Sequence, residues 1–179
     1  MSFHDEFVRR LRFIGGHADV VGLFADGGFL IRAAAALAAP FGEAGVTKVA
    51  ALEARGFILG SAVAVRLGVG FVPIRKSGSI HPGPKAERRT PPDWRGRESV
   101  LQMQRAALEE RDRVLLVDDW AETGSQAITA RTLIEECGAS YAGMSVLVDQ
   151  LPRKARARLT PFFSVAGDEE FEDDGSAGR

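Results

Sequence analysis

Four short, almost wholly apolar runs separated by helical patterns constrain the fold of this chain more than any other feature. They cover residues 46–52, 69–74, 114–117 and 144–148. Their residues do not alternate between apolar and polar, as a strand with one face in water would require. Near-continuous apolar strands are typical of a parallel sheet that is covered on both faces. We therefore predict an α/β fold with a mostly parallel central sheet flanked by helices.

Helical patterns lie before and between these runs. Residues 28–39 are rich in Ala and Leu and stop at Pro40, which indicates a helix. Residues 57–67 and 125–136 space their apolar side chains as helices do. At the start of the chain, apolar residues recur at helical spacing through Ile14. They predict an amphipathic helix that ends at the two glycines that follow.

Length and composition predict one domain with a hydrophobic core. The chain has 179 residues, of which 45% are hydrophobic, and this is within the usual size range of a single domain. We assign residues 1–167 to this domain. Residues 76–97 carry many Pro, Gly and charged residues, so we expect a long mobile loop without a buried element. The acidic composition of residues 168–179 predicts a disordered tail.

Charge, cysteine content and hydropathy exclude several classes of protein. The 23 basic and 24 acidic residues leave a net charge of -1, which argues against a nucleic-acid-binding surface. A single cysteine, Cys137, cannot form an internal disulfide, and residues 1–6 lack the pattern of a secretory signal, so we expect a cytoplasmic protein. The longest apolar stretch, residues 29–40, contains Arg32 and is too short to cross a membrane.

The segment of residues 114–126 carries the strongest functional signal. An apolar strand ends in Asp118 and Asp119 and leads through a small, glycine-containing turn into a helix. In an open α/β sheet, ligands bind beyond the carboxyl ends of the strands, so both acids are expected at the functional edge. The turn supplies backbone N–H groups and the positive end of a helix dipole, which together bind phosphate. Its residues are Ala121, Glu122, Thr123, Gly124, Ser125 and Gln126.

Two carboxylates beside a phosphate-binding turn narrow the class of ligand. They repel an anion, so we expect them to bind hydroxyl groups or an associated cation, and a sugar phosphate satisfies both conditions. One alternative is that the acids only cap the turn that follows them. Another is a receiver or phosphatase domain, although such domains place their acids at earlier strands. The P-loop and dinucleotide-binding glycine fingerprints are both absent from the sequence.

This pattern resembles the type I phosphoribosyltransferases, whose signature is an apolar strand, two acids, a Thr-Gly turn and a helix. Residues 52–60, 70–76 and 161–164 are similar to the adenine phosphoribosyltransferase branch of that family. The resemblance follows the same order along the chain from His17 to Ser164. It implies the type I phosphoribosyltransferase fold, with a small N-terminal hood over the base site.

The resemblance also implies how the donor, phosphoribosyl pyrophosphate, is bound. Asp118 and Asp119 would contact the ribose hydroxyls, and residues 121–126 would hold the 5′-phosphate. Arg55, in the pyrophosphate loop, would join the two acids in catalysis. The other donor-binding residues implied by the family pattern are Ala54, Gly56, Arg75 and Lys76. A Mg²⁺ ion would bridge pyrophosphate and hydroxyls, so no set of protein metal ligands is expected.

The sequence departs from the adenine branch in four places, one of which is Ser79, where the family has a lysine. The family's Phe-Arg-Asp-Ile-Ser-like stretch is replaced by residues 17–21, which contain no arginine. Residues 94–98 lack the Glu-Tyr pair of the family's long loop. Glu122 adds a negative charge to the phosphate turn, and we expect its side chain to point outward. The candidate base-binding residues are His17, Asp19 and Trp120.

The function implied by the resemblance is that of a pentosyltransferase in purine salvage and nucleoside metabolism. Such an enzyme moves a 5-phosphoribosyl group from phosphoribosyl pyrophosphate to an adenine-like purine and yields a nucleoside monophosphate and pyrophosphate. Two alternatives stay open: a regulatory protein that binds the donor without turnover, and a transferase that acts on a non-adenine heterocycle. The expected partners are the donor, a nucleobase and a second copy of the chain, because related enzymes are commonly homodimers.

Overall fold

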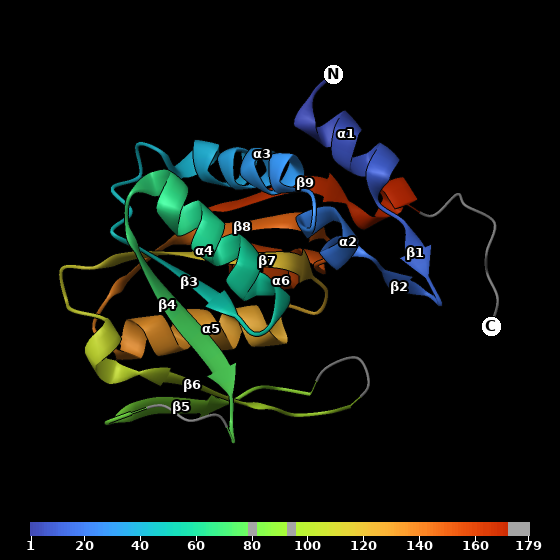
Figure 1. Ribbon diagram of the computed structural model, residues 1–179. Helices are drawn as coiled ribbons and strands as arrows, with labels where there is room; N and C mark the ends of the chain where they lie inside the picture. Colours follow the sequence, from blue (N-terminus) through green and yellow to red (C-terminus); the bar gives the residue numbers. More distant parts are fainter. Residues whose placement is uncertain (79–81, 93–95, 172–179) are drawn as a thin grey trace.

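A twisted sheet of seven strands forms the centre of the computed structural model, which describes residues 1–78, 82–92 and 96–171 (Figure 1). The strand order is β5-β6-β4-β3-β7-β8-β9. The strands are β3 (Lys48–Leu52), β4 (Gly70–Lys76), β5 (Lys85–Arg89), β6 (Val100–Gln104), β7 (Arg113–Ala121), β8 (Ser140–Asp149) and β9 (Phe162–Gly167). Five neighbouring strands run parallel to one another: β4, β3, β7, β8 and β9. The strand β6 is antiparallel to both of its neighbours, β4 and β5. The predicted α/β fold with a mostly parallel sheet is therefore confirmed.

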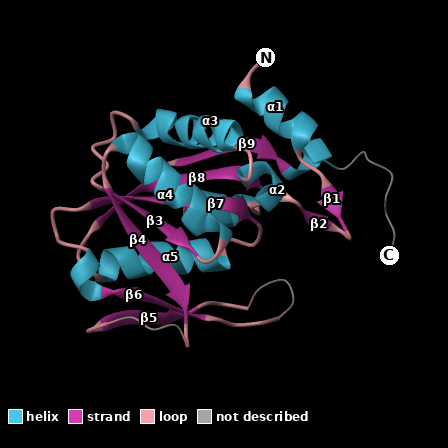
Figure 2. Cartoon of the chain, in the orientation of Figure 1, coloured by secondary structure: helices cyan, strands magenta, loops and turns pink. Residues whose placement is uncertain are grey.

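Helices cover both faces of this sheet (Figure 2). They are α1 (Phe3–Arg10), α2 (Val20–Phe24), α3 (Gly27–Ala38), α4 (Arg55–Leu67), α5 (Ser125–Glu136) and α6 (Arg153–Ala157). The helices α3 and α4 pack together on one face, while α5 covers the other. Among the described residues, every helix is too short or too polar to cross a bilayer.

The central strands are buried because helices lie on both sides of them. The side chains of Val49, Ala50 and Ala51 in β3 are fully buried, as are those of residues 114–117 in β7. Neighbouring residues of these strands point to opposite faces, so one strand contributes to two hydrophobic clusters. This explains why the strands read as continuous apolar runs rather than as alternating ones.

The strand β7 is longer than the sequence predicts, and its extra length carries the acid pair beyond the end of β3. Its pairing with β3 ends at Val117, whereas its pairing with β8 continues to Ala121. Asp118 and Asp119 therefore lie inside a strand but beyond the end of its neighbour β3. One edge of β7 is open at this point, and the open edge forms the floor of the site described below.

The N-terminal segment differs from the sequence-based prediction. The first helix ends at Arg10 rather than at the glycines, and residues 13–18 form a small antiparallel hairpin of β1 (Phe13–Ile14) and β2 (His17–Ala18). Gly15 and Gly16 have φ angles of 57° and 78°, which form the tight hairpin turn. The hairpin carries Phe13 next to Trp120, with the two ring centroids 6.2 Å apart.

The predicted long loop without a buried element is wrong for part of its length. Residues 85–89 form β5, which pairs with β6, and Ala86 in β5 is buried. The charged neighbours Glu87, Arg88 and Arg89 are exposed, so this edge strand buries only one side chain and has no apolar run in the sequence. Residues 79–81 and 93–95, which belong to the same predicted loop, lie outside the described residues.

The acidic tail is also partly ordered. Residues 168–171 form a short 3-10 helix, η3 (Asp168–Phe171), and the ring of Phe171 packs 5.8 Å from that of Phe7. The prediction of a disordered tail is therefore wrong for residues 168–171, because one aromatic side chain anchors them to the core. Residues 172–179 lie outside the described residues.

Candidate active site

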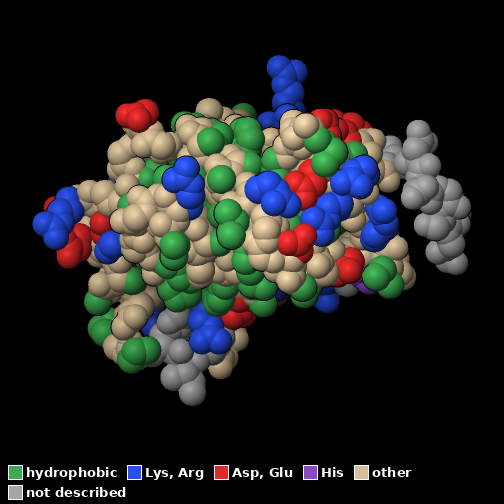
Figure 3. All heavy atoms as spheres, turned by 45° about the horizontal axis from the view of Figure 1, so that its top comes forward, with side chains coloured by type: hydrophobic (Ala, Val, Ile, Leu, Met, Phe, Trp, Pro, Cys, Tyr) green, Lys and Arg blue, Asp and Glu red, His purple; other side chains and the backbone are tan. Residues whose placement is uncertain are grey.

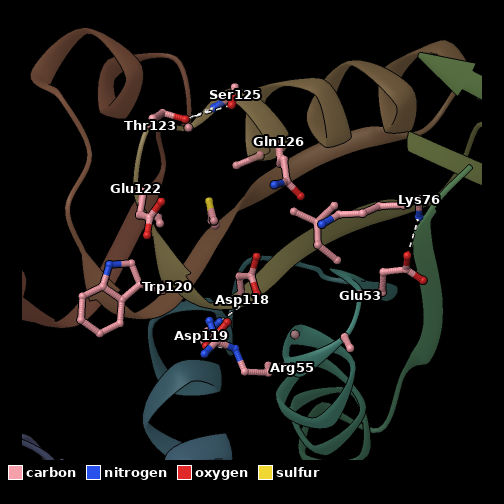
Figure 4. A pocket seen from close by; sticks show the side chains of 17 residues that line it. Glu53, Arg55, Lys76, Asp118, Asp119, Trp120, Glu122, Thr123, Ser125 and Gln126 are labelled. Atoms are coloured by element: carbon pink, nitrogen blue, oxygen red, sulfur yellow. Dashed lines mark hydrogen bonds and ion pairs between the residues drawn. The ribbon is translucent and has the colours of Figure 1, made fainter. Parts of the chain in front are cut away.

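A polar hollow of about 240 Å³ lies at the carboxyl ends of β3 and β7 (Figure 4). Loops and helix ends that are far apart in the sequence meet there. The residues that line it are Leu52, Glu53, Ala54, Arg55, Gly56, Lys76, Asp118, Asp119, Trp120, Ala121, Glu122, Thr123, Gly124, Ser125, Gln126, Ala127 and Met144. The structure thus brings together the predicted acid pair, the phosphate turn and the pyrophosphate loop.

The acid pair forms the floor of the hollow. The Oδ1 atom of Asp118 accepts a hydrogen bond of 2.9 Å from the backbone N–H of Asp119. The loss of hydration and the negative charge of Asp119 raise the pKa of the Asp118 carboxyl well above its usual value. The Oδ2 atom of Asp119 lies 2.9 Å from Nε of Arg55 in an ion pair. This oxygen is buried and, apart from the ion pair, accepts no hydrogen bond within the described part of the chain.

A glycine lets the pyrophosphate loop approach the acids closely. A Cβ atom on Gly56 would lie 2.7 Å from Oδ1 of Asp118, which is too close for any other residue. Gly56 stands in the first turn of α4, and Arg55 is the first residue of that helix. The N-terminus of α4 therefore faces the carboxylates, with free N–H groups and a positive side chain directed at the same space.

The phosphate turn has the geometry expected of an anion site. Gly124 adopts a φ of 77°, and a Cβ atom there would meet Leu151 and Ala155 at 3.0 Å. The hydroxyl of Thr123 accepts the N–H of Ser125 at 3.3 Å and lies 2.9 Å from the Ser125 hydroxyl. The next N–H groups of α5 have no partner within the helix, as in the first turn of any helix. They make the start of α5 suited to a phosphate.

Of the two basic residues at the end of β4, Lys76 reaches the hollow and Arg75 does not. Lys76 lines the hollow, and its backbone N–H donates to Oε1 of Glu53 at 2.9 Å. Arg75 is not among the lining residues, and its Nε lies 3.3 Å from Oε2 of Glu53. Glu53 is a lining residue that the sequence-based assignment missed. Its position directly after the buried strand β3 could have indicated this, because residues that follow a parallel strand lie at the edge of the sheet where ligands bind.

The predicted base-binding residues are only partly brought together. Trp120 lines the hollow, and its Nε1 donates to the side chain of Gln150 at 3.0 Å. His17 lies in the hairpin whose Phe13 contacts Trp120, but it does not line the hollow. Asp19 caps α2 by accepting the N–H of Gly22 at 2.9 Å, and it too lies outside the hollow.

A second hollow of about 360 Å³ adjoins the first. It is lined by Glu122, Thr123, Gln150 and Pro152, so Glu122 and Thr123 border both spaces. In the close-up, the Glu122 side chain lies between Trp120 and Thr123 (Figure 4). Glu122 is exposed, and no hydrogen bond or ion pair joins its carboxylate to another residue in the described ranges.

Comparisons with known proteins show the family to which the chain belongs. The phosphoribosyl transferase domain family matches residues 26–172. The chain is 41% identical to the adenine phosphoribosyltransferase of Streptomyces coelicolor over 148 residues, which cover 83% of this chain and 80% of the relative. The chain belongs to the phosphoribosyltransferase family, in its adenine phosphoribosyltransferase branch. A relative of the same name from Cereibacter sphaeroides is 44% identical over 142 residues, 79% of this chain and 78% of the relative.

Solved structures of adenine phosphoribosyltransferases share the fold. The enzyme of Giardia lamblia in complex with 9-deazaadenine superposes with a TM-score of 0.82 at 29% identity and covers 94% of this chain and 98% of that one. The enzyme of Rhodothermus marinus gives a TM-score of 0.82 at 30% identity, and the match covers 92% of this chain and 98% of that one. The predicted type I phosphoribosyltransferase fold is therefore confirmed. The family match also reaches Phe171, in keeping with the packed C-terminal segment.

Proposed function

We propose that this protein transfers the 5-phosphoribosyl group of phosphoribosyl pyrophosphate to adenine. A bond forms between C1′ of the ribose and a ring nitrogen of the base, and the bond from C1′ to the pyrophosphate oxygen breaks. Pyrophosphate leaves with the bonding electrons, and the proton that the base loses passes to water. The observation that carries the proposal is one hollow that combines two carboxylates with an amide-lined turn at a helix N-terminus.

Each part of the donor has a complementary part of the hollow. The 5′-phosphate fits the turn between Ala121 and the start of α5, where the first N–H groups of the helix have no partner within the helix. The ribose hydroxyls fit Asp118 and Asp119, since Oδ2 of Asp119 is buried and accepts no hydrogen bond from the described residues besides its ion pair with Arg55. Arg55 and Lys76 border the opposite side and are suited to the pyrophosphate. Arg55 releases Asp119 when it turns to the pyrophosphate.

The acid pair also fits a Mg²⁺ ion held together with the donor. The buried oxygen of Asp119 is a hard ligand of the kind that Mg²⁺ prefers, and the described residues contain no group of three or more acidic, His or Cys side chains that would form a protein cage. When bound, the ion neutralises the negative charge that develops on the departing pyrophosphate. The protein's own share is to orient the ribose, to hold the phosphate and to keep water from C1′.

The base is expected beside Trp120, the aromatic side chain nearest the acids. Contacts with Phe13 and Phe171, at 6.2 and 6.3 Å between ring centroids, hold its indole ring in place. We assign His17 to the hood that covers the base, since it shares the hairpin with Phe13. Asp19 supports that hood by capping α2.

The test is an assay of pyrophosphate release with phosphoribosyl pyrophosphate, Mg²⁺ and a panel of purines. We expect turnover with adenine and the loss of at least about two orders of magnitude in Asp119→Asn, because a charged hydrogen-bond partner of the donor is removed. Glu43→Gln is a matched control, since Glu43 is exposed at the opposite end of β3. Donor binding in calorimetry without product from any base would instead indicate a regulatory protein. No donor binding at all would overturn the site assignment.

We further propose a homodimer that works in the cytoplasm. Several apolar side chains on the face of α3 and α4 are exposed: Ile31 at 71%, Ile58 at 40% and Val65 at 82%. This face comes forward in Figure 3, where apolar side chains lie among scattered charges. A second copy of the same face is the occupant that would bury all three residues symmetrically. The lone, half-buried Cys137 is in keeping with a reducing compartment.

A further inference from the structure

The phosphate turn is supported from behind by α6 and by the residues that lead into this helix. A Cβ atom on Gly124 would meet the Cβ atom of Ala155 and the Cδ2 atom of Leu151 at 3.0 Å. Ala155 of α6 and the buried Leu151 before it therefore lie directly against the backbone of the turn. The shape of the turn thus depends on how firmly these two residues are held.

The helix α6 needs anchors outside its own sequence. It has five residues and no side-chain cap, and a helix this short is not stable by itself in water. Its residues are exposed apart from Ala155, which is half-buried, so burial of apolar surface adds little. Arg131 holds the far end of the segment, because its Nη1 donates to the carbonyl of Arg158 at 2.6 Å. The end nearer the phosphate turn requires an anchor of its own.

The carboxylate of Asp149 is the anchor at that end. Asp149 is the last residue of β8 and pairs in register with Ala121, where the phosphate turn begins. Its Oδ1 atom accepts the N–H of Leu151 at 2.8 Å, and its Oδ2 atom forms an ion pair with Arg156 of α6. One side chain therefore holds both of the segments that contact Gly124.

The burial of Asp149 makes its partner important. Its side chain is only 4% exposed, whereas that of Arg156 is 52% exposed and lies with its guanidinium carbon 5.9 Å from the centre of the Phe162 ring. A buried carboxylate without a charged partner is costly. Loss of Arg156 would therefore force Asp149 to turn toward water or to bind a proton, and either change would loosen its hold on Leu151 and α6.

We propose that Asp149 and Arg156 are positioning residues that keep the phosphate turn in the shape that binds the 5′-phosphate of the donor. Neither residue lines the hollow, so both act through the segments that contact Gly124. This inference deepens the proposed function and rests on it. A pair that only stabilised the fold would raise the melting temperature and have no influence on the affinity for the phosphate.

The experiment measures the binding of ribose 5-phosphate to the full-length chain and to its variants by calorimetry with Mg²⁺ present. Arg156→Met removes the charge but keeps an apolar stem, and we expect it to weaken binding about fivefold or more, because the turn is no longer held in place. Arg156→Lys retains a positive charge that can pair with Asp149 and should restore most of the affinity. Arg158→Met is the matched control and should leave the affinity unchanged. Arg158 is exposed, and its side chain makes no ion pair in the described ranges.

The double variant Asp149→Asn/Arg156→Met separates position from charge. It leaves the net charge of the chain unchanged and buries no unpaired carboxylate, so it should fold. Because the link between β8 and α6 is still missing, it should bind ribose 5-phosphate as weakly as Arg156→Met does. An affinity equal to that of the original protein would show that Arg156 acts only by its charge, and would overturn the positioning role.

Turnover supplies the second readout. We expect the KM for phosphoribosyl pyrophosphate to rise in Arg156→Met in step with the lost affinity. The kcat at saturating donor and the KM for adenine should stay within about twofold of their original values. An unchanged donor KM together with a lower melting temperature would assign the ion pair to the fold alone and overturn its positioning role. An unsubstituted protein that binds no ribose 5-phosphate and turns over no purine would overturn the proposed function instead, so the two failures are distinct.

Discussion

At the scale of single residues, Asp118 combines a functional position with a cost in stability. Its pKa is raised because the carboxyl has lost hydration and faces Asp119. The folded protein therefore binds this proton more tightly than the unfolded chain does. The carboxyl contributes stability at pH values below its unfolded pKa of about 3.9, and that contribution is lost as the pH rises through the raised folded pKa.

The sign of this effect leads to a prediction for Asp118→Asn. The variant should be more stable than the original protein at pH 7.5, by about 1 kcal/mol or about 2–4 °C in Tm, and the advantage should vanish near pH 3.5. It should also lose turnover, since the ribose contact is removed. Thermal melts over this pH range test it, with Glu43→Gln as the control for loss of one charge. A variant that melts below the original protein at pH 7.5 contradicts the assignment.

Gly124 is the second residue whose conformation the site requires. We expect Gly124→Ala to cost about 1–3 kcal/mol, because its φ of 77° is strained for alanine and the new methyl meets Leu151 and Ala155 at 3.0 Å. Gly68→Ala separates the two causes, since Gly68 has a φ of 70° but no atom within 4 Å of the added Cβ. Urea unfolding of both variants is the measurement. Equal costs at the two sites would mean that the packing around Gly124 contributes nothing.

The sequence predicts the position of a residue well where that position follows from the course of the backbone. Asp118, Asp119 and the turn that follows them could be assigned because a buried strand leading into a glycine turn fixes where they emerge. Arg75 and Asp19 could not, because their neighbours in the sequence do not reveal the partners that hold their side chains. The side chain of Arg75 is paired with Glu53, and the side chain of Asp19 accepts a hydrogen bond from the N-terminus of α2.

At the scale of elements, the C-terminal η3 is held to α1 by one exposed contact and one aromatic contact. The Nε2 atom of His4 lies 2.7 Å from Oε2 of Glu170, and Phe171 packs on Phe7. The hydrogen bond to Glu170 raises the pKa of His4 above its usual value. Its contribution to stability is therefore fully present below about pH 6.5 and is lost as the pH rises through the folded pKa.

We expect His4→Ala to loosen this segment only in acid. Hydrogen exchange of the backbone amides of residues 168–171 should accelerate a few fold at pH 6, where the ion pair is worth less than about 1 kcal/mol, and should be unchanged at pH 8.5. His17→Ala, a change at another exposed histidine, is the control. Acceleration of the same size at both pH values would show that the contact does not depend on the histidine charge.

The elements missed from the sequence share a physical reason. The helices α3, α4 and α5 were predicted because each repeats apolar residues over three turns or more and ends at a recognisable stop. The hairpin of β1 and β2 has two residues in each strand, and β5 buries only Ala86, so neither has a period to detect. Their order comes from tertiary contacts with Trp120 and β6 rather than from local pattern.

At the scale of the whole molecule, the face of α3 and α4 is the feature that a single chain leaves unexplained. Both helices bury one side against the sheet and against each other. Ile58 and Val65 are seven residues apart on α4, which places them on one side of that helix. Isolated exposed apolar residues are common, but three on a pair of packed helices favour an interface. In a symmetric dimer each of these side chains would meet the same face of its partner.

The prediction is that the chain sediments as a dimer of about twice its 19.2 kDa mass at micromolar concentration. The double variant Ile31→Glu/Val65→Glu would bury four negative charges between the two copies. Their repulsion and loss of hydration should shift the equilibrium from dimer to monomer. Ile14→Glu is the control, because Ile14 is 67% exposed in the hairpin of β1 and β2 rather than on α3 or α4, and should leave the mass unchanged. Sedimentation of the unsubstituted protein as a monomer over the accessible concentration range would contradict the interface. If the double variant is monomeric yet keeps the far-ultraviolet circular dichroism of the original protein, the apolar face joins the copies without being needed to fold each one.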